Sequence, residues 1–179
     1  MKAGDLSTFL ARIDAAEYGL CRRLNSGAAN SSLRRLLRIV SRLGDGVAWY
    51  VLIFALPLIY GRAAVRPAVA MAVTGIAGVA IYKALKRTFV RKRPFVTYPG
   101  IDCAAAPLDF YSFPSGHTLH AVSFTWQAVA HFGDLAWMLV PFTCLIAASR
   151  VVLGLHYPSD VVVGAVLGAL LAAVGLSFS

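Results

Sequence analysis

Acidic side chains are scarce in this sequence of 179 residues. Eight aspartates and glutamates stand against 17 lysines and arginines. Charged residues make up only 14% of the chain, against about 25% in soluble domains. No catalytic carboxylate pair, metal-ligand cluster or glycine-rich nucleotide loop is found. We therefore expect neither a metal nor a cofactor.

Cysteine is also rare, with only Cys21, Cys103 and Cys144. Their spacing matches neither a zinc site nor a C-x-x-C motif. Cys144 stands within an apolar run, which favours a buried small side chain. Whether Cys21 and Cys103 pair is left open, because a disulfide requires an oxidising compartment.

Apolar residues, in contrast, are abundant and grouped in long blocks. The chain is 59% hydrophobic, with a mean hydropathy of +0.70, which indicates a membrane protein. Its formal charge of +9 then points to anionic lipid headgroups, and not to nucleic acid, as the electrostatic partner. We expect no cleavable signal peptide, because charged residues interrupt the first twenty positions.

The apolar blocks predict an all-α integral membrane helical bundle with about five spanning helices. The first and third blocks are short for a bilayer, which needs about 20 residues per helix. Small residues four positions apart (Gly164, Gly168, Ala172) predict close helix packing in the last block. The five blocks are 47–60, 64–85, 116–132, 135–153 and 159–176.

Two amphipathic segments precede this bundle, at residues 6–24 and 32–43. Their arginines would be costly inside a bilayer, so neither segment is expected to span it. Both suit N-terminal interfacial helices, and a soluble helical hairpin packed on the bundle is the alternative left open. We therefore divide the chain into a basic amphipathic segment, 1–44, and a membrane-embedded domain, 45–179.

Three polar clusters interrupt the apolar framework. They are K-R-T-F-V-R-K-R-P at 86–94, P-S-G-H at 114–117, and S-R-V-V-L-G-L-H-Y-P-S-D at 149–160. If all five blocks cross the bilayer, the three clusters lie on the same face of the membrane. The connection 86–115 contains four prolines (Pro94, Pro99, Pro107 and Pro114) and predicts an ordered loop.

The residue types in these clusters suit phosphate chemistry. Ser115 is the predicted N-cap of the helix that follows, and Gly116 beside it exposes backbone N–H groups, which attract anions at a helix start. Lys86, Arg93 and Arg150 can hold phosphate oxygens. Arg87, Arg91 and Lys92 we interpret as ordinary positive charge beside a helix end. His120 is left open between the cavity wall and a polar helix face.

The patterns K-x6-RP, PSGH and SR-x5-H-x3-D together resemble the type 2 phosphatidic acid phosphatase superfamily, which includes membrane lipid phosphatases and vanadium haloperoxidases. The resemblance implies that His156 attacks phosphorus to give a phosphohistidine and that Asp160 orients it. It implies that His117 protonates the leaving oxygen and then activates water. The implied phosphate ligands are Lys86, Arg93, Ser115, Gly116 and Arg150.

The resulting functional hypothesis is metal-independent hydrolysis of a phosphomonoester or diphosphate on a membrane lipid, either undecaprenyl diphosphate or phosphatidylglycerophosphate. The expected partners are that lipid and the bilayer, and the oligomeric state is left open. Alternatives are a phosphatase for lipid A or another glycolipid, a vanadate-dependent haloperoxidase, and a non-catalytic lipid-binding protein. His156 and His117 argue against the last alternative.

We expect a multi-pass protein of the inner (cytoplasmic) membrane. Two arguments on its orientation conflict. Apart from the three phosphate-binding cations, 12 lysines and arginines fall on the side of the site and two on the other side, which favours a cytoplasmic site. The resemblance favours a site facing outward, as for enzymes of envelope lipids, and this is the orientation we expect.

Overall fold

The computed structural model describes residues 3–27 and 30–179, and all the regular elements in these ranges are helices. The all-α prediction is therefore confirmed for the described part of the chain. In order, the elements are α1 (Ala3–Gly27), α2 (Ser31–Leu43), α3 (Val47–Tyr60), η1 (Gly61–Ala64), α4 (Val65–Phe89), α5 (Pro94–Thr97), α6 (Gly116–His131), η2 (Gly133–Leu135), α7 (Ala136–Val152) and α8 (Pro158–Leu176).

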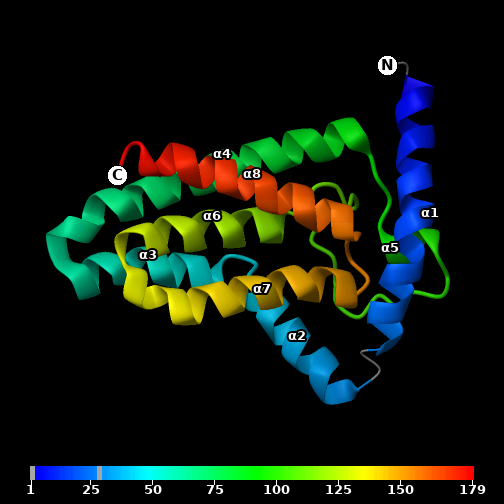
Figure 1. Cartoon of the computed structure of the whole chain (residues 1–179), viewed down its shortest axis with the longest axis horizontal. Coiled ribbons are helices and arrows are strands. Elements are labelled where there is room, and N and C mark those ends of the chain that lie inside the picture. Colours follow the sequence, from blue (N-terminus) through cyan, green and yellow to red (C-terminus); the bar gives the residue numbers. More distant parts are fainter. Residues whose placement is uncertain (1–2, 28–29) are drawn as a thin grey trace.

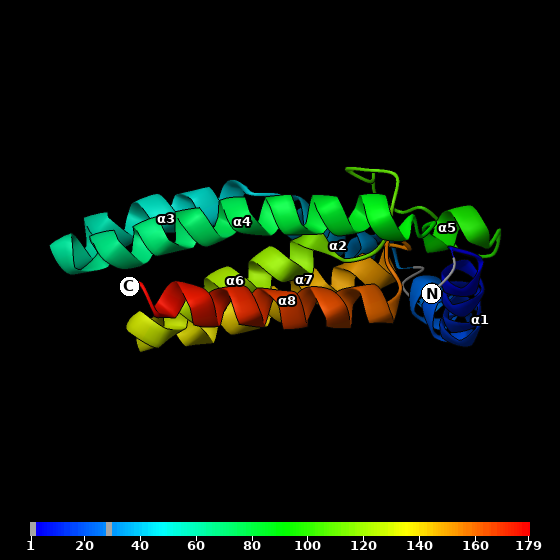
Figure 2. The ribbon, with the colours of Figure 1, turned by 90° about the horizontal axis from the view of Figure 1, so that it is seen from above.

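The five long apolar helices run along the long axis of the molecule (Figure 1). Seen from above, α3 and α4 form one layer, and α6, α7 and α8 form the other (Figure 2). Helix α6 is central, because it packs against α4, α7 and α8. Helix α1 instead lies across one end of the bundle (Figure 1).

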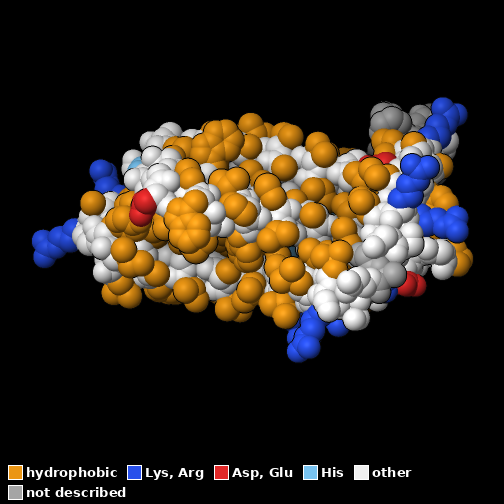
Figure 3. All heavy atoms as spheres, turned by 60° about the horizontal axis from the view of Figure 1, so that its bottom comes forward, with side chains coloured by type: hydrophobic (Ala, Val, Ile, Leu, Met, Phe, Trp, Pro, Cys, Tyr) orange, Lys and Arg blue, Asp and Glu red, His pale blue; other side chains and the backbone are white. Residues whose placement is uncertain are grey.

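Three stretches of the described chain are long and apolar enough to cross a membrane: Val47–Thr97, Gly133–Val152 and Pro158–Leu176. The first contains both α3 and α4, which fold back on each other. Hydrophobic side chains cover the length of the bundle, and lysine and arginine gather toward its ends (Figure 3). The expected count of about five spans stays a prediction, since α6, with 16 residues, is not among these stretches.

Glycines in α8 allow its close approach to α6. A Cβ atom on Gly164 would lie 2.5 Å from the carbonyl oxygen of Ser115, and one on Gly168 would lie 2.4 Å from that of Leu119. Real side chains do not tolerate such distances, so these two positions require glycine. The close packing predicted from the small-residue spacing is thus confirmed, and it fixes α8 against the start of α6.

The N-terminal helices leave apolar side chains exposed. Helix α1 buries Cys21 and Asn25, whereas Leu20 is 49% and Leu24 is 40% exposed. Asn25 is held by hydrogen bonds from its side-chain nitrogen to the carbonyl oxygens of Asp102 (3.1 Å) and Val152 (2.9 Å). Because these polar contacts lie on the packed side, the apolar leucines face away from the bundle. The side chains of Leu6, Phe9 and Leu10 lie outside the described residues.

The cysteines are free. Cys21 is buried and Cys103 is exposed, and burial raises the pKa of the Cys21 thiol to about 12. The prediction that Cys144 is buried is wrong, because its side chain is exposed on the outer surface of α7. That surface belongs to an apolar stretch suited to lipid, which accepts a cysteine as readily as a protein core does.

Candidate active site

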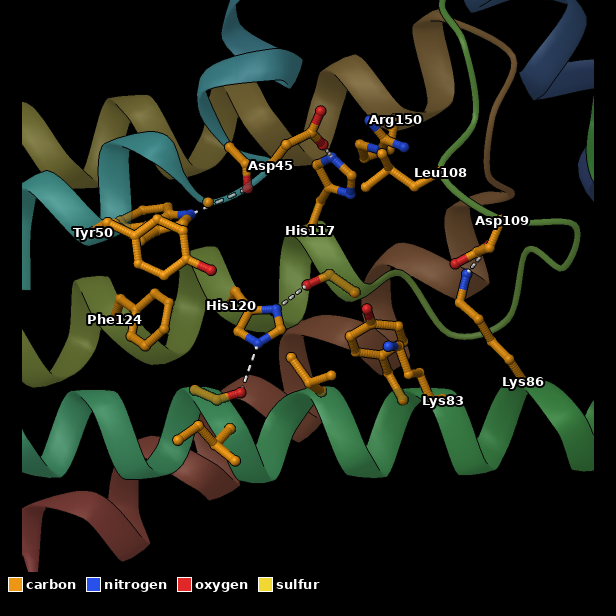
Figure 4. Close-up of a pocket in the computed structure, with 18 of the residues that line it drawn as sticks. Asp45, Tyr50, Lys83, Lys86, Leu108, Asp109, His117, His120, Phe124 and Arg150 are labelled. Carbon is orange, nitrogen blue, oxygen red and sulfur yellow. Dashed lines mark hydrogen bonds and ion pairs between the residues drawn. The ribbon is translucent and has the colours of Figure 1, made fainter.

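The three polar clusters meet around one cavity of about 550 Å³. Its lining residues include some from the C-terminal turns of α4 and α7 and the first turn of α6. Figure 4 shows its side chains converging from α4, α6, α7 and the connection before α6. The predicted site residues that line it are Lys86, Arg93, Gly116, His117, Arg150 and His156. Ser115 and Asp160, both fully buried, lie behind this wall.

His156 and Asp160 form a pair at the start of α8. The Nδ1 atom of His156 lies 3.5 Å from Oδ2 of Asp160, which also accepts a hydrogen bond from the backbone N–H of Tyr157 at 2.9 Å. A distance of 3.5 Å is long for a hydrogen bond, as is common in a site without substrate. The carboxylate of Asp160 therefore faces the imidazole ring of His156.

The other ring nitrogen of His156 faces Arg93. Nε2 lies 3.2 Å from Nη1 of Arg93, which can only donate. Nε2 is therefore the acceptor nitrogen, and Nδ1 carries the hydrogen toward Asp160. Complete burial, together with the cations Arg93, Arg150 and Lys86, holds the pKa of His156 well below its usual range. The imidazole is thus neutral, with a lone pair on Nε2, as a nucleophile requires.

Lys86 and Arg93 converge on one carboxylate. Oδ1 of Asp109 lies 2.7 Å from Nζ of Lys86 and 2.7 Å from Nη2 of Arg93, as the labelled pair in Figure 4 illustrates for Lys86. Lys86 comes from the last turn of α4, because that helix extends to Phe89. The two cations thus already share one anionic oxygen, in the arrangement that a phosphate oxygen would need.

Arg150 is buried in the last turn of α7. Its Nη1 donates to the hydroxyl of Ser41 in α2, and its Nε has no hydrogen-bond partner among the described residues. A buried donor without a partner is costly and favours binding of an acceptor. Arg150 lines the cavity, so a bound phosphate oxygen can meet this need.

His117 stands in the first turn of α6, directly after the predicted cap. Ser115 is the N-cap, because its Oγ accepts from the backbone N–H of Thr118 at 3.4 Å, which confirms that prediction. The Nε2 atom of His117 contacts Oδ1 of Asp45, from the turn between α2 and α3 (Figure 4). Asp45 is therefore placed to stabilise a protonated His117.

Three residues near the site were misjudged or missed from the sequence. Arg91, interpreted as ordinary flanking charge, is instead buried and binds three carboxylates. The reason is that the chain leaves α4 at Val90 and turns Arg91 back toward α1 and α8. No sequence motif pointed to Asp45 or Asp109. The small number of acidic residues could have pointed to them, because each carboxylate in such a basic chain is expected to pair with a cation.

Apolar side chains line the rest of the cavity. They come from α3 (Trp49, Ile53, Phe54), α4 (Ile76, Val79) and α6 (Phe124). His120 also lines it, with Nδ1 at 2.9 Å from the carbonyl oxygen of Gly116 and Nε2 at 3.1 Å from that of Gly75 (Figure 4). The cavity therefore joins a cationic end to an apolar groove along the bundle.

A family model described as the PAP2 superfamily matches residues 63–179. The chain belongs to the PAP2 superfamily. The matched segment contains all three polar clusters, and α1 and α2 lie before it.

Two curated relatives illustrate the similarity. The undecaprenyl-diphosphatase BcrC of Bacillus subtilis is 33% identical over 130 residues, which make up 72% of this chain and 64% of that protein. The decaprenylphosphoryl-5-phosphoribose phosphatase of Mycobacterium tuberculosis is 36% identical over 97 residues, or 53% of this chain and 51% of that protein. The aligned segments therefore span less than two thirds of these relatives.

Two crystal structures share this PAP2 fold. Aquifex aeolicus LpxE has a TM-score of 0.79 at 24% identity, covering 91% of this chain and 96% of that one. A transmembrane PAP2-type phosphatidylglycerolphosphate phosphatase from Bacillus subtilis has a TM-score of 0.69 at 23% identity, covering 97% and 94%. With its apolar stretches, this PAP2 chain is a multi-pass membrane protein.

Proposed function

We propose that the chain hydrolyses a phosphate ester or diphosphate of a membrane lipid, without a metal ion, through a phosphohistidine on His156. One observation carries the proposal. The neutral Nε2 of His156 lies beside three buried cations at the polar end of a cavity whose remainder is apolar. A phosphorylated lipid matches this cavity, because its headgroup is anionic and its chain is apolar.

In the first step, the Nε2 lone pair attacks phosphorus and the bond from phosphorus to the leaving oxygen breaks. His117 gives its proton to that oxygen. The imidazolium of His156 is balanced by Asp160, and Lys86, Arg93 and Arg150 hold the phosphoryl oxygens together with the backbone at Gly116, whereas the N–H of Ser115 is already donated to the carbonyl oxygen of Asp160. Preorganised cations of this kind stabilise charge that develops in the transition state.

In the second step, water attacks the phosphorus of the phosphohistidine. His117 accepts the proton of the water, and the bond between phosphorus and Nε2 breaks. Inorganic phosphate leaves and His156 returns to its neutral form. Asp45 supports both roles of His117, because its carboxylate stabilises the protonated ring before the first step and after the second.

We place a polyisoprenyl diphosphate first among the substrates. The undecaprenyl-diphosphatases of Bacillus subtilis and Sulfolobus acidocaldarius, 33% and 27% identical to this chain, support this ranking. Lys83 lines the cavity as well, and this additional cation would suit a second phosphate. Phosphatidylglycerophosphate comes next, and lipid A third. A haloperoxidase is disfavoured, since the relatives named above act on phosphorylated compounds.

The test is phosphate release from purified lipids in detergent, in the presence of EDTA. We expect release to persist with EDTA, to be inhibited by vanadate, and to fall by roughly three orders of magnitude or more in His156→Ala. His131→Ala is the matched control, because this histidine lies at the far end of α6 from His117. Activity that chelation removes and magnesium restores would contradict the mechanism.

We also propose that residues 45–179 form a membrane-embedded phosphatase domain with five spanning helices, and that 1–44 lies in the membrane interface. The exposed leucines of α1 and α2 support this placement, because they face away from the bundle beside exposed arginines. We propose the inner membrane as the location, with the site facing outward.

A further inference from the structure

The guanidinium of Arg91 lies behind the candidate active site, between α1 and α8. Its side chain is 1% exposed. Nε donates to Oδ1 of Asp14 at 2.8 Å, Nη2 to Oε2 of Glu17 at 2.9 Å, and Nη1 to Oδ1 of Asp160 at 2.6 Å. The ring of Tyr157 lies 4.1 Å from Cζ. The side chain is thus fixed by three carboxylates from two helices.

Asp160 is fixed equally firmly. Oδ1 receives the Arg91 hydrogen bond, whereas Oδ2 accepts from the backbone N–H of Tyr157 and faces Nδ1 of His156. A fully buried carboxylate requires a partner cation to remain ionised. Arg91 supplies that charge and also sets the plane of the carboxylate, and so the oxygen presented to His156.

Helix α1 holds Arg91 in turn. Asp14 and Glu17 are three residues apart and so lie on one face of the helix. Glu17 also accepts from the backbone N–H of Ser159 at 2.6 Å and from its hydroxyl at 2.7 Å. It therefore satisfies a free donor in the first turn of α8. Helix α1 lies before the segment that the family model matches.

The backbone before Arg91 is unusual. Val90, the C-cap that follows α4, has a φ of 47°, a left-handed conformation that β-branched residues rarely adopt. Lys86, one turn earlier, lines the cavity, whereas Arg91 lies behind Asp160. Strained backbone of this kind persists where the surrounding contacts enforce it.

We propose that Arg91 is a positioning residue of the reaction, and that Asp14 and Glu17 of α1 hold it against Asp160. The proposal rests on the proposed function. It makes the N-terminal helix part of the site, because α1, Arg91 and Asp160 form one chain of contacts that ends at His156.

The test compares Arg91→Gln with Lys92→Gln, the exposed neighbouring cation. We expect kcat to fall roughly 10- to 100-fold in Arg91→Gln, as for other groups that orient a reacting ligand. KM and the inhibition constant of vanadate should stay within about twofold, because Arg91 does not line the cavity. Vanadate-binding stoichiometry corrects the rate for inactive protein. A corrected kcat equal to that of Lys92→Gln would overturn the proposal.

A double-mutant cycle separates positioning from general stability. In an Asp160→Asn background, Arg91→Gln should cause no further loss of kcat, since Arg91 acts through that carboxylate. If the fold losses of kcat in the two single variants multiply in the double variant, the two residues act independently and the proposal is overturned. If Arg91→Gln does not fold, Asp14→Asn with Glu17→Gln keeps the arginine, and its kcat should fall severalfold at unchanged vanadate affinity. Wild-type kcat in that variant overturns the proposal, whereas an inactive wild-type enzyme overturns the proposed function instead.

Discussion

At the scale of single residues, the main electrostatic feature of the site is that few carboxylates pair with its several cations. Asp109 lies between Lys86 and Arg93 at 2.7 Å from each, and Asp45 contacts His117. Asp109 thus occupies the place that a phosphate oxygen would need between these two cations. We therefore expect Asp109 to influence how tightly phosphate binds.

Replacing Asp109 tests this competition. In Asp109→Asn, inorganic phosphate should inhibit at roughly tenfold lower concentration, because the charged competitor for Lys86 and Arg93 is gone. The inhibition constant of phosphate is the measurement. Asp102→Asn is the control, since this exposed aspartate lies in the same connection and pairs with Arg34, away from the cavity. Weaker phosphate binding in Asp109→Asn would show that the carboxylate orders the cations instead.

His117 offers a second test at this scale. His117→Ala should lower kcat by about 100- to 10,000-fold on a lipid phosphate, the usual contribution of a general acid–base group. The rate of phosphoenzyme formation should fall much less on a substrate such as p-nitrophenyl phosphate, whose leaving group needs no proton, although turnover stays slow because the attack of water also uses His117. The measurement is the rate of phosphoenzyme formation with each substrate. An equal loss of that rate on both substrates would contradict the role of His117 as the acid.

Motif residues could be predicted from the sequence because their spacing is local. Ser115 was recognised as a cap because it precedes an apolar helix. The role of Arg91 could not be predicted, because its partners Asp14 and Glu17 lie 77 and 74 positions away. Nothing in the sequence around Arg91 distinguishes it from the exposed Arg87 and Lys92.

At the scale of elements, the contact between α6 and α8 sets the geometry of the site. The backbone N–H of Ser115 donates to the carbonyl oxygen of Asp160 at 3.0 Å, so the turn before α6 is joined directly to the first turn of α8. Gly164 is the residue that lets α8 come this close to Ser115.

Gly164→Ala should therefore destabilise the protein by about 1–3 kcal/mol, the usual cost of overpacking. Its kcat should fall as well, because the shift of α8 separates His156 from the phosphate-binding turn. Thermal unfolding in detergent measures the first effect. Gly133→Ala, at a position with open space around it, is the control. Unchanged thermal stability in Gly164→Ala would mean that α8 accommodates the methyl group without moving.

The apolar helices were predicted to within a few residues, because their hydropathy changes sharply at each end. The predicted block 64–85 fell short at its C-terminal end, since α4 continues to Phe89 through basic residues. These basic residues end the apolar block but not the helix, because the positive charges of Lys86 and Arg87 interact favourably with the C-terminal end of the helix dipole.

At the scale of the whole molecule, the arrangement of α1 could not be predicted. Its leucine stripe suggested a helix packed through apolar contacts or lying on lipid. The structure packs it through Asp14, Glu17, Cys21 and Asn25. These contacts join segments distant in the chain, so local periodicity contains no information about them.

Orientation is testable at this scale. Pro99→Cys, with Cys103→Ser, should react with a membrane-impermeant thiol reagent in intact cells if the site faces outward. Cys21 is buried, and the raised pKa of its thiol suppresses its reactivity. Arg62→Cys, at the opposite end of the bundle, should react only after lysis. The reverse pattern would place the site in the cytoplasm and favour phosphatidylglycerophosphate as substrate.

The pairing of most acidic side chains near the site affects how lipids diffuse laterally around the protein. Five of the eight acids (Asp14, Glu17, Asp45, Asp109, Asp160) pair with Arg91, Lys86, Arg93 or His117. These five acids therefore do not neutralise the exposed arginines of α1 and α2 near the site. Each of these arginines attracts anionic lipid by about 1 kcal/mol. With the proposed activity, we expect phosphorylated lipid to be enriched around the protein, and the product, which has lost charge, to diffuse away more easily.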